Sequence, residues 1–172
     1  MSGPRYAELQ VTSHFSFLRG ASSCDELFAA AALLGIEALA VVDRNSLAGV
    51  VRAHEAAKAT GIRLIVGCRL DLADGMSLLV YPRDRAAYGR LCRLLSLGKS
   101  RGGKGLCHLE WADVVAYGEG LIAILLPDLA DDTCAMQLRR LREVFGTNAY
   151  VALTLRRRPN DQLRIHELAN LA

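Results

Sequence analysis

The sequence has no apolar stretch long enough to cross a bilayer. Its longest uninterrupted apolar runs, 27–34 and 121–126, are far shorter than the roughly 20 residues that a membrane-spanning helix needs. Residues 1–10 contain no apolar segment of the kind found in secretory signal peptides. We therefore expect a cytoplasmic protein that makes no contact with a membrane.

Cysteine sites and nucleotide-binding loops are also missing. The number of cysteines is odd and no two stand in C-x-x-C spacing, so neither a disulfide framework nor a zinc knuckle is predicted: Cys24, Cys68, Cys92, Cys107 and Cys134. We expect them to be small buried residues of a reducing compartment. No G-x-G-x-x-G follows the first expected strand, and Gly98-Lys99-Ser100 lacks the upstream glycine of a phosphate loop because Arg93 stands there.

The excess of charge of one sign is small. Lys plus Arg is 21 and Asp plus Glu is 18, so the net charge is +3. A dedicated nucleic-acid-binding module is usually more basic. Basic clusters occur at 99–104, 139–142 and 156–158, and a solvated face is the simpler interpretation of each. The candidate nucleic-acid contacts are Lys99, Arg101 and Lys104 in the expected glycine-rich loop 100–109 and at its start.

What the sequence does have is a regular alternation of strand and helix patterns. Hydrophobic residues make up 52% of the 172 residues, enough for one domain, expected over 1–172, with its own core. Periodicity and capping signals predict strands at 6–12, 37–43, 63–68, 77–81, 121–126 and 149–155. They predict helices at 22–34, 46–60, 83–97, 110–117, 131–145 and 160–172. Such alternation predicts an α/β fold with a mostly parallel sheet, either open or closed into a barrel.

In parallel α/β folds the functional groups gather at the carboxyl ends of the strands. There the sequence places one carboxylate, Asp43, among arginines and neutral polar residues: Gln10, Thr12, His14, Arg19, Arg44 and Arg69. Metal sites need several histidine or carboxylate ligands. A triad of Ser16, His14 and Asp43 lacks a nucleophile elbow. The residues thus favour an ion-pair network around Asp43, with His14 packing locally.

Several of these segments together are similar to a known family. Leu9–Gly20 resembles the first motif of the PHP (polymerase and histidinol phosphatase) domain, where a strand carries His-x-His before a loop with Ser-x-x-Asp-Gly. Ala38–Gly49 resembles the second motif, a strand that ends in Asp-His, and Gly61–Arg69 the third, which ends in Gly-Cys-Glu. Segments 78–81, 88–96 and 118–125 resemble the continuation found in bacterial C-family DNA polymerase alpha subunits.

The resemblance implies a fold and a loss of chemistry. PHP domains are distorted seven-stranded (β/α) barrels that bind up to three metals for phosphoester hydrolysis, and we expect a barrel of this type, incomplete at the carboxyl end. Gln10 and Thr12 stand where the His-x-His pair belongs, Arg19 replaces the loop Asp, Arg44 the His, and Arg69 the Glu. Asp43 alone remains of the expected ligands. This pattern resembles the error-prone, damage-tolerant branch of the C-family polymerases.

Charge supports this interpretation. A guanidinium does not lose its proton in a protein, and beside a metal ion each one costs about 4 kcal/mol at an effective dielectric constant near 20. We expect no catalytic residue, metal or cofactor in this segment, with Asp43 paired to Arg19 or Arg69. The resemblance implies a parent polymerase that uses Mg, with the rest of that chain, DNA and other replication or translesion proteins as partners.

Two alternatives stay open. One is a phosphoesterase or 3′–5′ exonuclease that still uses a metal, with ligands from outside the residues named above. The other is an arginine-lined module that binds phosphate or single-stranded DNA.

Overall fold

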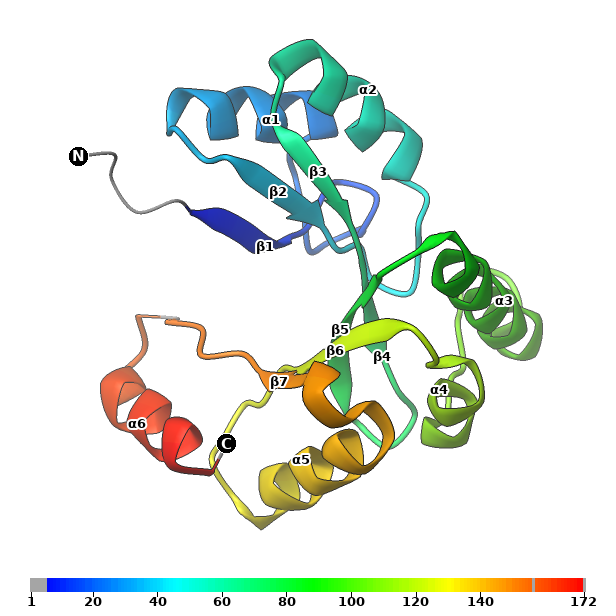
Figure 1. The fold of residues 1–172 in the computed structure, drawn as a ribbon, viewed down its shortest axis with the longest axis vertical. Helices are drawn as coiled ribbons and strands as arrows, with labels where there is room; N and C mark the ends of the chain where they lie inside the picture. Colours follow the sequence, from blue (N-terminus) through cyan, green and yellow to red (C-terminus); the bar gives the residue numbers. More distant parts are fainter. Residues whose placement is uncertain (1–5, 156, 172) are drawn as a thin grey trace. The chain divides into compact units, whose positions relative to one another are not determined.

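The computed structural model describes residues 6–155 and 157–171 (Figure 1). The chain divides into two compact units, Met1–Arg69 and Leu70–Ala172. No helix in the described residues is long and apolar enough to span a membrane. The strands of this part form a three-stranded and a four-stranded open sheet, which confirms the α/β class and an unclosed barrel.

The first unit is a parallel sheet of β1 (Ala7–Val11), β2 (Ala38–Val41) and β3 (Arg63–Val66), in that order. The crossover helices α1 (Cys24–Leu33) and α2 (Val50–Thr60) pack together on one face of this sheet (Figure 1). Phe28 of α1 and Leu39 of β2 lie in the apolar core between the layers. All four residues of β2 are buried, as expected for a central parallel strand.

Local signals place the ends of both helices. The Ser23 side chain accepts a hydrogen bond from the Glu26 backbone N–H, and the Glu26 carboxylate accepts one from the Ser23 N–H, so the two residues form a capping box at the start of α1. Helix α2 ends at Gly61, whose φ of 75° is the left-handed conformation that glycine tolerates best.

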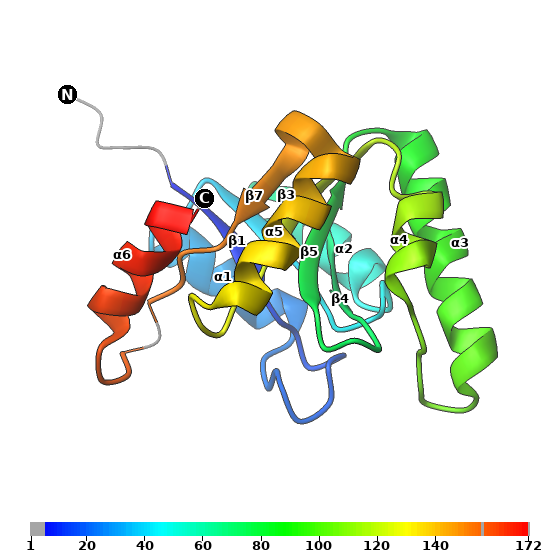
Figure 2. The same ribbon diagram turned by 90° about the horizontal axis from the view of Figure 1, so that it is seen from below.

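The second sheet consists of β4 (Cys68–Asp71), β5 (Ser77–Pro82), β6 (Leu121–Leu125) and β7 (Ala149–Val151), in that order, and apart from the first two residues of β4 it belongs to the second unit. Its helices are α3 (Arg85–Gly102), α4 (Trp111–Tyr117), α5 (Asp132–Phe145) and α6 (Asp161–Leu171), with a 3-10 turn at Gly146–Asn148. Helices α3 and α4 lie side by side (Figure 2). The α3 side chains of Leu91, Leu94 and Leu95, which recur at helical spacing, are buried.

Several sequence-based boundaries were wrong. The helix predicted to begin at residue 46 begins at Val50. The strand predicted at 63–68 ends at Val66, and β4 begins at Cys68 in the other sheet, because an unbroken apolar run carries no signal for a change of sheet at Gly67. The helix predicted to end at Leu97 continues to Gly102, so Lys99 and Arg101 lie on α3 and the loop begins at Gly103. The last strand ends at Val151, not at residue 155.

The sheet of the second unit is also less parallel than predicted. Strands β6 and β7 are parallel, but β5 and β6 are antiparallel. Two helices in series, α3 and α4, connect β5 to β6, and the second helix reverses the chain direction once more. The cysteines are all free thiols, of which Cys24, Cys68 and Cys134 are buried while the other two are half-buried.

Candidate functional site

The carboxyl ends of the strands in the first unit bring together the residues that the sequence singled out. The backbone N–H of Val42 donates to the carbonyl of Val11, which holds the chain after β1 beside the chain after β2. Arg44 and Arg69 form a parallel β-bridge, and the Arg69 N–H donates to the Asp43 carbonyl. Asp43 therefore lies between the loop that follows β1 and the chain that follows β3.

The Asp43 carboxylate is buried and accepts three hydrogen bonds from the loop after β1. The Ser13 N–H and the Ser16 hydroxyl donate to Oδ1, over 3.0 and 2.7 Å. The Ser13 hydroxyl donates to Oδ2 over 2.8 Å. Asp43, Ser13 and Ser16 are 2%, 0% and 5% exposed. A carboxylate that accepts several donors in a buried position is a strong anchor for the segment that supplies them.

Each serine hydroxyl is used twice. Ser13 Oγ accepts from the Phe15 N–H, and Ser16 Oγ accepts from the Arg44 N–H over 2.9 Å. Both hydroxyls thus donate to the carboxylate and accept from a backbone amide. No buried side-chain nitrogen or oxygen of the described residues lacks a hydrogen-bond partner. The arrangement, which we call the Asp43 network (Ser13, Ser16 and Asp43), is complete without an added ligand.

Two glycines allow the loop to approach this closely. A Cβ on Gly49 would lie 2.8 Å from Asp43 Oδ2 and 3.1 Å from a ring carbon of Phe15. A Cβ on Gly20 would lie 2.2 Å from the carbonyl oxygen of Ser13. A larger residue at either position would displace the loop or the carboxylate.

The predicted ion pair between Asp43 and Arg19 or Arg69 was wrong. Among the described residues the partners of this carboxylate are two serines, so Asp43 holds the loop and does not neutralise a guanidinium. Ser13 and Ser16 are hydrogen-bonding residues that can be read from the sequence. Nothing in the sequence, however, indicates that they contact a carboxylate about 30 positions away. Gly20 and Gly49 were likewise not recognised as packing positions.

His14 does not complete a catalytic triad. Its Nδ1 lies 3.2 Å from the carbonyl oxygen of Ser22, and its ring stacks on Phe15 with 4.5 Å between the ring centres. Ser16 donates directly to Asp43, so no histidine lies between hydroxyl and carboxylate. The prediction that His14 packs locally is confirmed.

The residues at the strand ends do not fit a metal centre. Gln10 lies on β1 and Thr12 just after it, and both are half-buried. Arg44 follows β2, and Arg69 is the second residue of β4. Within residues 6–155 and 157–171, no three His, Cys, Asp or Glu side chains are grouped so that they could hold a metal ion. Amide, hydroxyl and guanidinium groups in place of imidazoles and carboxylates leave too few anionic or nitrogen ligands for a divalent ion.

The Asp43 network holds a loop with an exposed apolar tip. Phe17 and Leu18 are 85% and 89% exposed, and Leu18 has a φ of 62°. A left-handed conformation is costly for a branched residue and persists only where the surrounding structure imposes it. The turn is fixed by the N–H groups of Arg19 and Gly20, which both donate to the carbonyl of Ser16.

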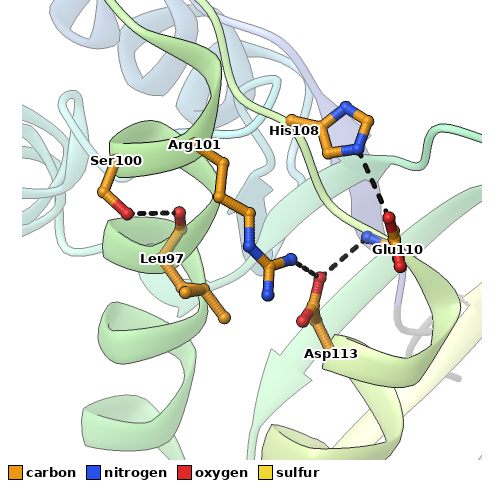
Figure 3. Close-up of polar contacts among 6 residues, drawn as sticks. All are labelled: Leu97, Ser100, Arg101, His108, Glu110 and Asp113. Atoms are coloured by element: carbon orange, nitrogen blue, oxygen red, sulfur yellow. Dashed lines mark hydrogen bonds and ion pairs between the residues drawn. The ribbon is translucent and has the colours of Figure 1, made fainter.

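The basic segment at the end of α3 has a structural partner. Arg101 forms a 2.6 Å ion pair with Asp113 of α4, and the Glu110 N–H donates to the same carboxylate oxygen over 2.9 Å (Figure 3). Burial alone would raise the pKa of Asp113, but the Glu110 N–H and the Arg101 guanidinium outweigh it and lower this pKa. Arg101 therefore joins two helices, while Lys99 and Lys104 are exposed.

Comparison with known proteins gives consistent matches. The family model described as the PHP domain matches residues 8–158. The chain is 72% identical over 172 residues to error-prone DNA polymerase 1 of Agrobacterium fabrum, which covers 100% of this chain and 16% of that protein. It is 47% identical over 173 residues to an error-prone DNA polymerase of Caulobacter vibrioides, with 99% and 16% covered. The chain thus spans about 16% of the length of these relatives.

Two solved structures share the fold. One, described as a proposed metal-dependent phosphoesterase from Bifidobacterium adolescentis, has a TM-score of 0.70 at 14% identity and covers 98% of this chain and 83% of that one. The other, an amidohydrolase from Chromobacterium violaceum with bound sulfate and no metal, has a TM-score of 0.68 at 17% identity, with 96% and 82% covered.

Proposed function

Because this chain belongs to the PHP domain family, we propose that it is a PHP module of an error-prone DNA polymerase in which metal-dependent hydrolysis has been lost. Its role in damage-tolerant synthesis is then structural: it presents a fixed loop to the rest of the polymerase. The polymerase setting is supported by the 72% identity to error-prone DNA polymerase 1 of Agrobacterium fabrum.

The Asp43 network is the observation that carries the proposal. A metal ion in this position would have to displace hydroxyl protons that point at the carboxylate and a backbone N–H that is bound to it. It would then lie near Arg44 and Arg69, whose guanidinium groups keep their charge. The network uses the remaining carboxylate to hold the loop and leaves it without the open coordination that a hydrolytic metal needs.

Metal content tests this proposal directly. The 172-residue chain is purified without chelator, dialysed against zinc and manganese and then against buffer, and measured by inductively coupled plasma mass spectrometry. We expect less than about a tenth of an ion per chain, because the ligand set is incomplete. One or more retained ions would overturn the proposal. Metal-dependent hydrolysis of a phosphodiester would then favour the phosphoesterase alternative.

A ligand-restored variant provides the matched control. Gln10→His, Thr12→His and Arg69→Glu together return two imidazoles and a carboxylate to the strand ends. We expect this variant to hold more zinc or manganese than the parent chain when both are folded to the same extent by circular dichroism. Equal and substantial binding by both chains would mean that the metal lies elsewhere.

The structural role needs a test in a polymerase. The matching segment of the Agrobacterium fabrum error-prone DNA polymerase 1 can be exchanged for this chain and primer extension measured. We expect synthesis to continue in the exchanged protein. The double substitution Phe17→Ser and Leu18→Ser, which alters only the exposed tip, should weaken the polymerase through lost packing. Unchanged activity and stability of the double variant would contradict the interaction role of the loop.

A further inference from the structure

The second unit contains a pocket formed by other residues than those at the strand ends discussed above. It has a volume of about 210 Å³ and is formed by α5, β7 and the end of α6. Besides small residues, its walls are two arginines, a tyrosine and three aliphatic residues: Leu138, Arg139, Arg142, Tyr150, Val151 and Leu171. The pocket therefore combines positive charge, an aromatic ring and an apolar surface.

The arginines of the basic cluster 139–142 have different surroundings because of their spacing on the helix. Arg140 forms a 3.3 Å ion pair with Asp74, and its guanidinium carbon lies 4.9 Å from the centre of the Trp111 ring. Arg139 and Arg142, three residues apart on α5, line the pocket instead. Within residues 6–155 and 157–171, neither of these two guanidinium groups has an ion-pair or hydrogen-bond partner. Two unmatched cations beside one cavity favour an anionic ligand.

The remaining wall suits a flat ring. Tyr150 on β7 is 53% exposed and lines the pocket, and the pairing of its strand with β6 fixes its backbone position. A cavity of about 150 Å³ is enough to hold benzene in a protein interior. The larger volume here leaves room for a planar group against Tyr150 and the aliphatic side chains.

We propose that this pocket binds one nucleotide of single-stranded DNA, with the base stacked on Tyr150 and the adjoining phosphate on Arg139 and Arg142. A groove that combines arginines with an aromatic stacking surface is the usual means of holding single strands without reading their sequence. The choice of DNA over other anions rests on the proposed polymerase setting, while the charge and the ring come from the pocket itself.

Salt dependence tests the phosphate contacts. Binding of a fluorescein-labelled twelve-residue oligothymidylate to the 172-residue chain is measured by anisotropy over a range of salt concentrations. Each lost phosphate contact lowers the slope of log affinity against log salt by about 0.7 for a single strand. The double variant Arg139→Ala and Arg142→Ala should therefore lose about 1.4 from this slope and bind at least tenfold more weakly.

A matched control removes the same charge elsewhere. Arg85 and Arg93 are exposed on α3 of the same unit and do not line the pocket. The double variant Arg85→Ala and Arg93→Ala should keep the parent slope and affinity within about twofold, because those residues contact no phosphate. Equal losses in the two double variants would overturn the proposal and leave only a general effect of net charge.

Tyr150 gives a second, independent measurement. Tyr150→Ala should weaken binding about fivefold or more without a change in slope, whereas Tyr150→Phe, which keeps the ring, should bind like the parent. An abasic oligomer of the same length should be insensitive to Tyr150→Ala. Photo-crosslinking of bromodeoxyuridine DNA should map to the peptide that contains Tyr150.

The outcomes separate this site from the proposed function. If the pocket variants keep both the parent salt slope and the crosslink, the DNA site is refuted. That result leaves the metal measurement on the parent chain unaffected. Equal competition by inorganic polyphosphate at the same charge, with no effect of Tyr150→Ala, would show an anion site that does not recognise nucleotides.

Discussion

Asp43→Asn tests the Asp43 network because it keeps the shape of the side chain and removes its charge. The amide oxygen can still accept from the Ser13 N–H and the Ser16 hydroxyl. The amide nitrogen, however, replaces Oδ2 and faces the Ser13 hydroxyl, which donates to that position in the parent chain. The Ser13 hydroxyl must then accept from both the amide and the Phe15 N–H, and its own proton loses its acceptor.

The three hydrogen bonds set the size of the effect. Hydrogen bonds to a charged group contribute about 1.5–3 kcal/mol each and neutral ones about 0.5–1.5 kcal/mol, so the three together should lose about 3 kcal/mol. Removing a buried charge saves part of its desolvation cost, which reduces the expected loss in unfolding free energy to about 2 kcal/mol. Asp43→Ala would leave three hydrogen-bond donors without acceptors. The resulting loss of unfolding free energy should approach the whole stability of a small domain, which is about 5–15 kcal/mol.

Urea unfolding followed by circular dichroism measures the overall change. Hydrogen exchange measured by mass spectrometry on peptides that cover residues 9–20 and 42–49 measures the local one. We expect the amides of Ser13 and Arg44 to exchange faster in Asp43→Asn. Glu55→Gln is the matched control: it removes one carboxylate from the same unit, but its partner Lys58 is exposed, so the loss should be below about 0.5 kcal/mol.

The reasoning would be refuted by a folded Asp43→Asn chain that unfolds within about 0.5 kcal/mol of the parent and shows no faster exchange in the two peptides. That result would mean that the serines find equally good partners without the carboxylate. A loss of stability with unchanged local exchange would place the effect outside the loop after β1.

Two further predictions concern the second unit. Arg101→Ala should cost about 1 kcal/mol at neutral pH, since Arg101 is partly exposed. The pKa of Asp113 is lowered by folding, so this contribution is present above its ordinary pKa near 4 and is lost as pH falls below it; urea unfolding at several pH values should show the two proteins converging in acid. A Cβ on Gly98 would lie 2.6 Å from Cys107 Sγ and from Leu109 Cδ2, so Gly98→Ala should destabilise the unit by about 1–3 kcal/mol. Gly89→Ala, also in α3 but with nothing within 4 Å of its Cβ, should stabilise the unit by about 0.5–1 kcal/mol. Thermal unfolding measures both variants, and an equal shift of their melting temperatures would show that packing at Gly98 is not the cause.

The candidate site could be located from the sequence but not assembled from it. The strand ends were predicted because periodicity marks β1 and β2, and the resemblance to the PHP motifs named Asp43 and the arginines. The partner of Asp43 could not be predicted, because Ser13 and Ser16 lie 30 and 27 residues away and contact it only when two strands pair in a given register. Electrostatic reasoning chose an arginine, whereas the geometry of the loop supplied hydroxyls and an amide.

By itself the sequence determined the local elements and the residue types that stand at the strand ends. Capping at Ser23, termination at Gly61 and the buried run of β2 follow from short-range rules that need no knowledge of the fold. Tertiary structure alone decided which polar groups meet: Arg101 with Asp113, Arg140 with Asp74, and Asp43 with its serines. The reason is physical, since side-chain periodicity is set within a few residues, while the partner of a buried charge depends on how distant segments pack.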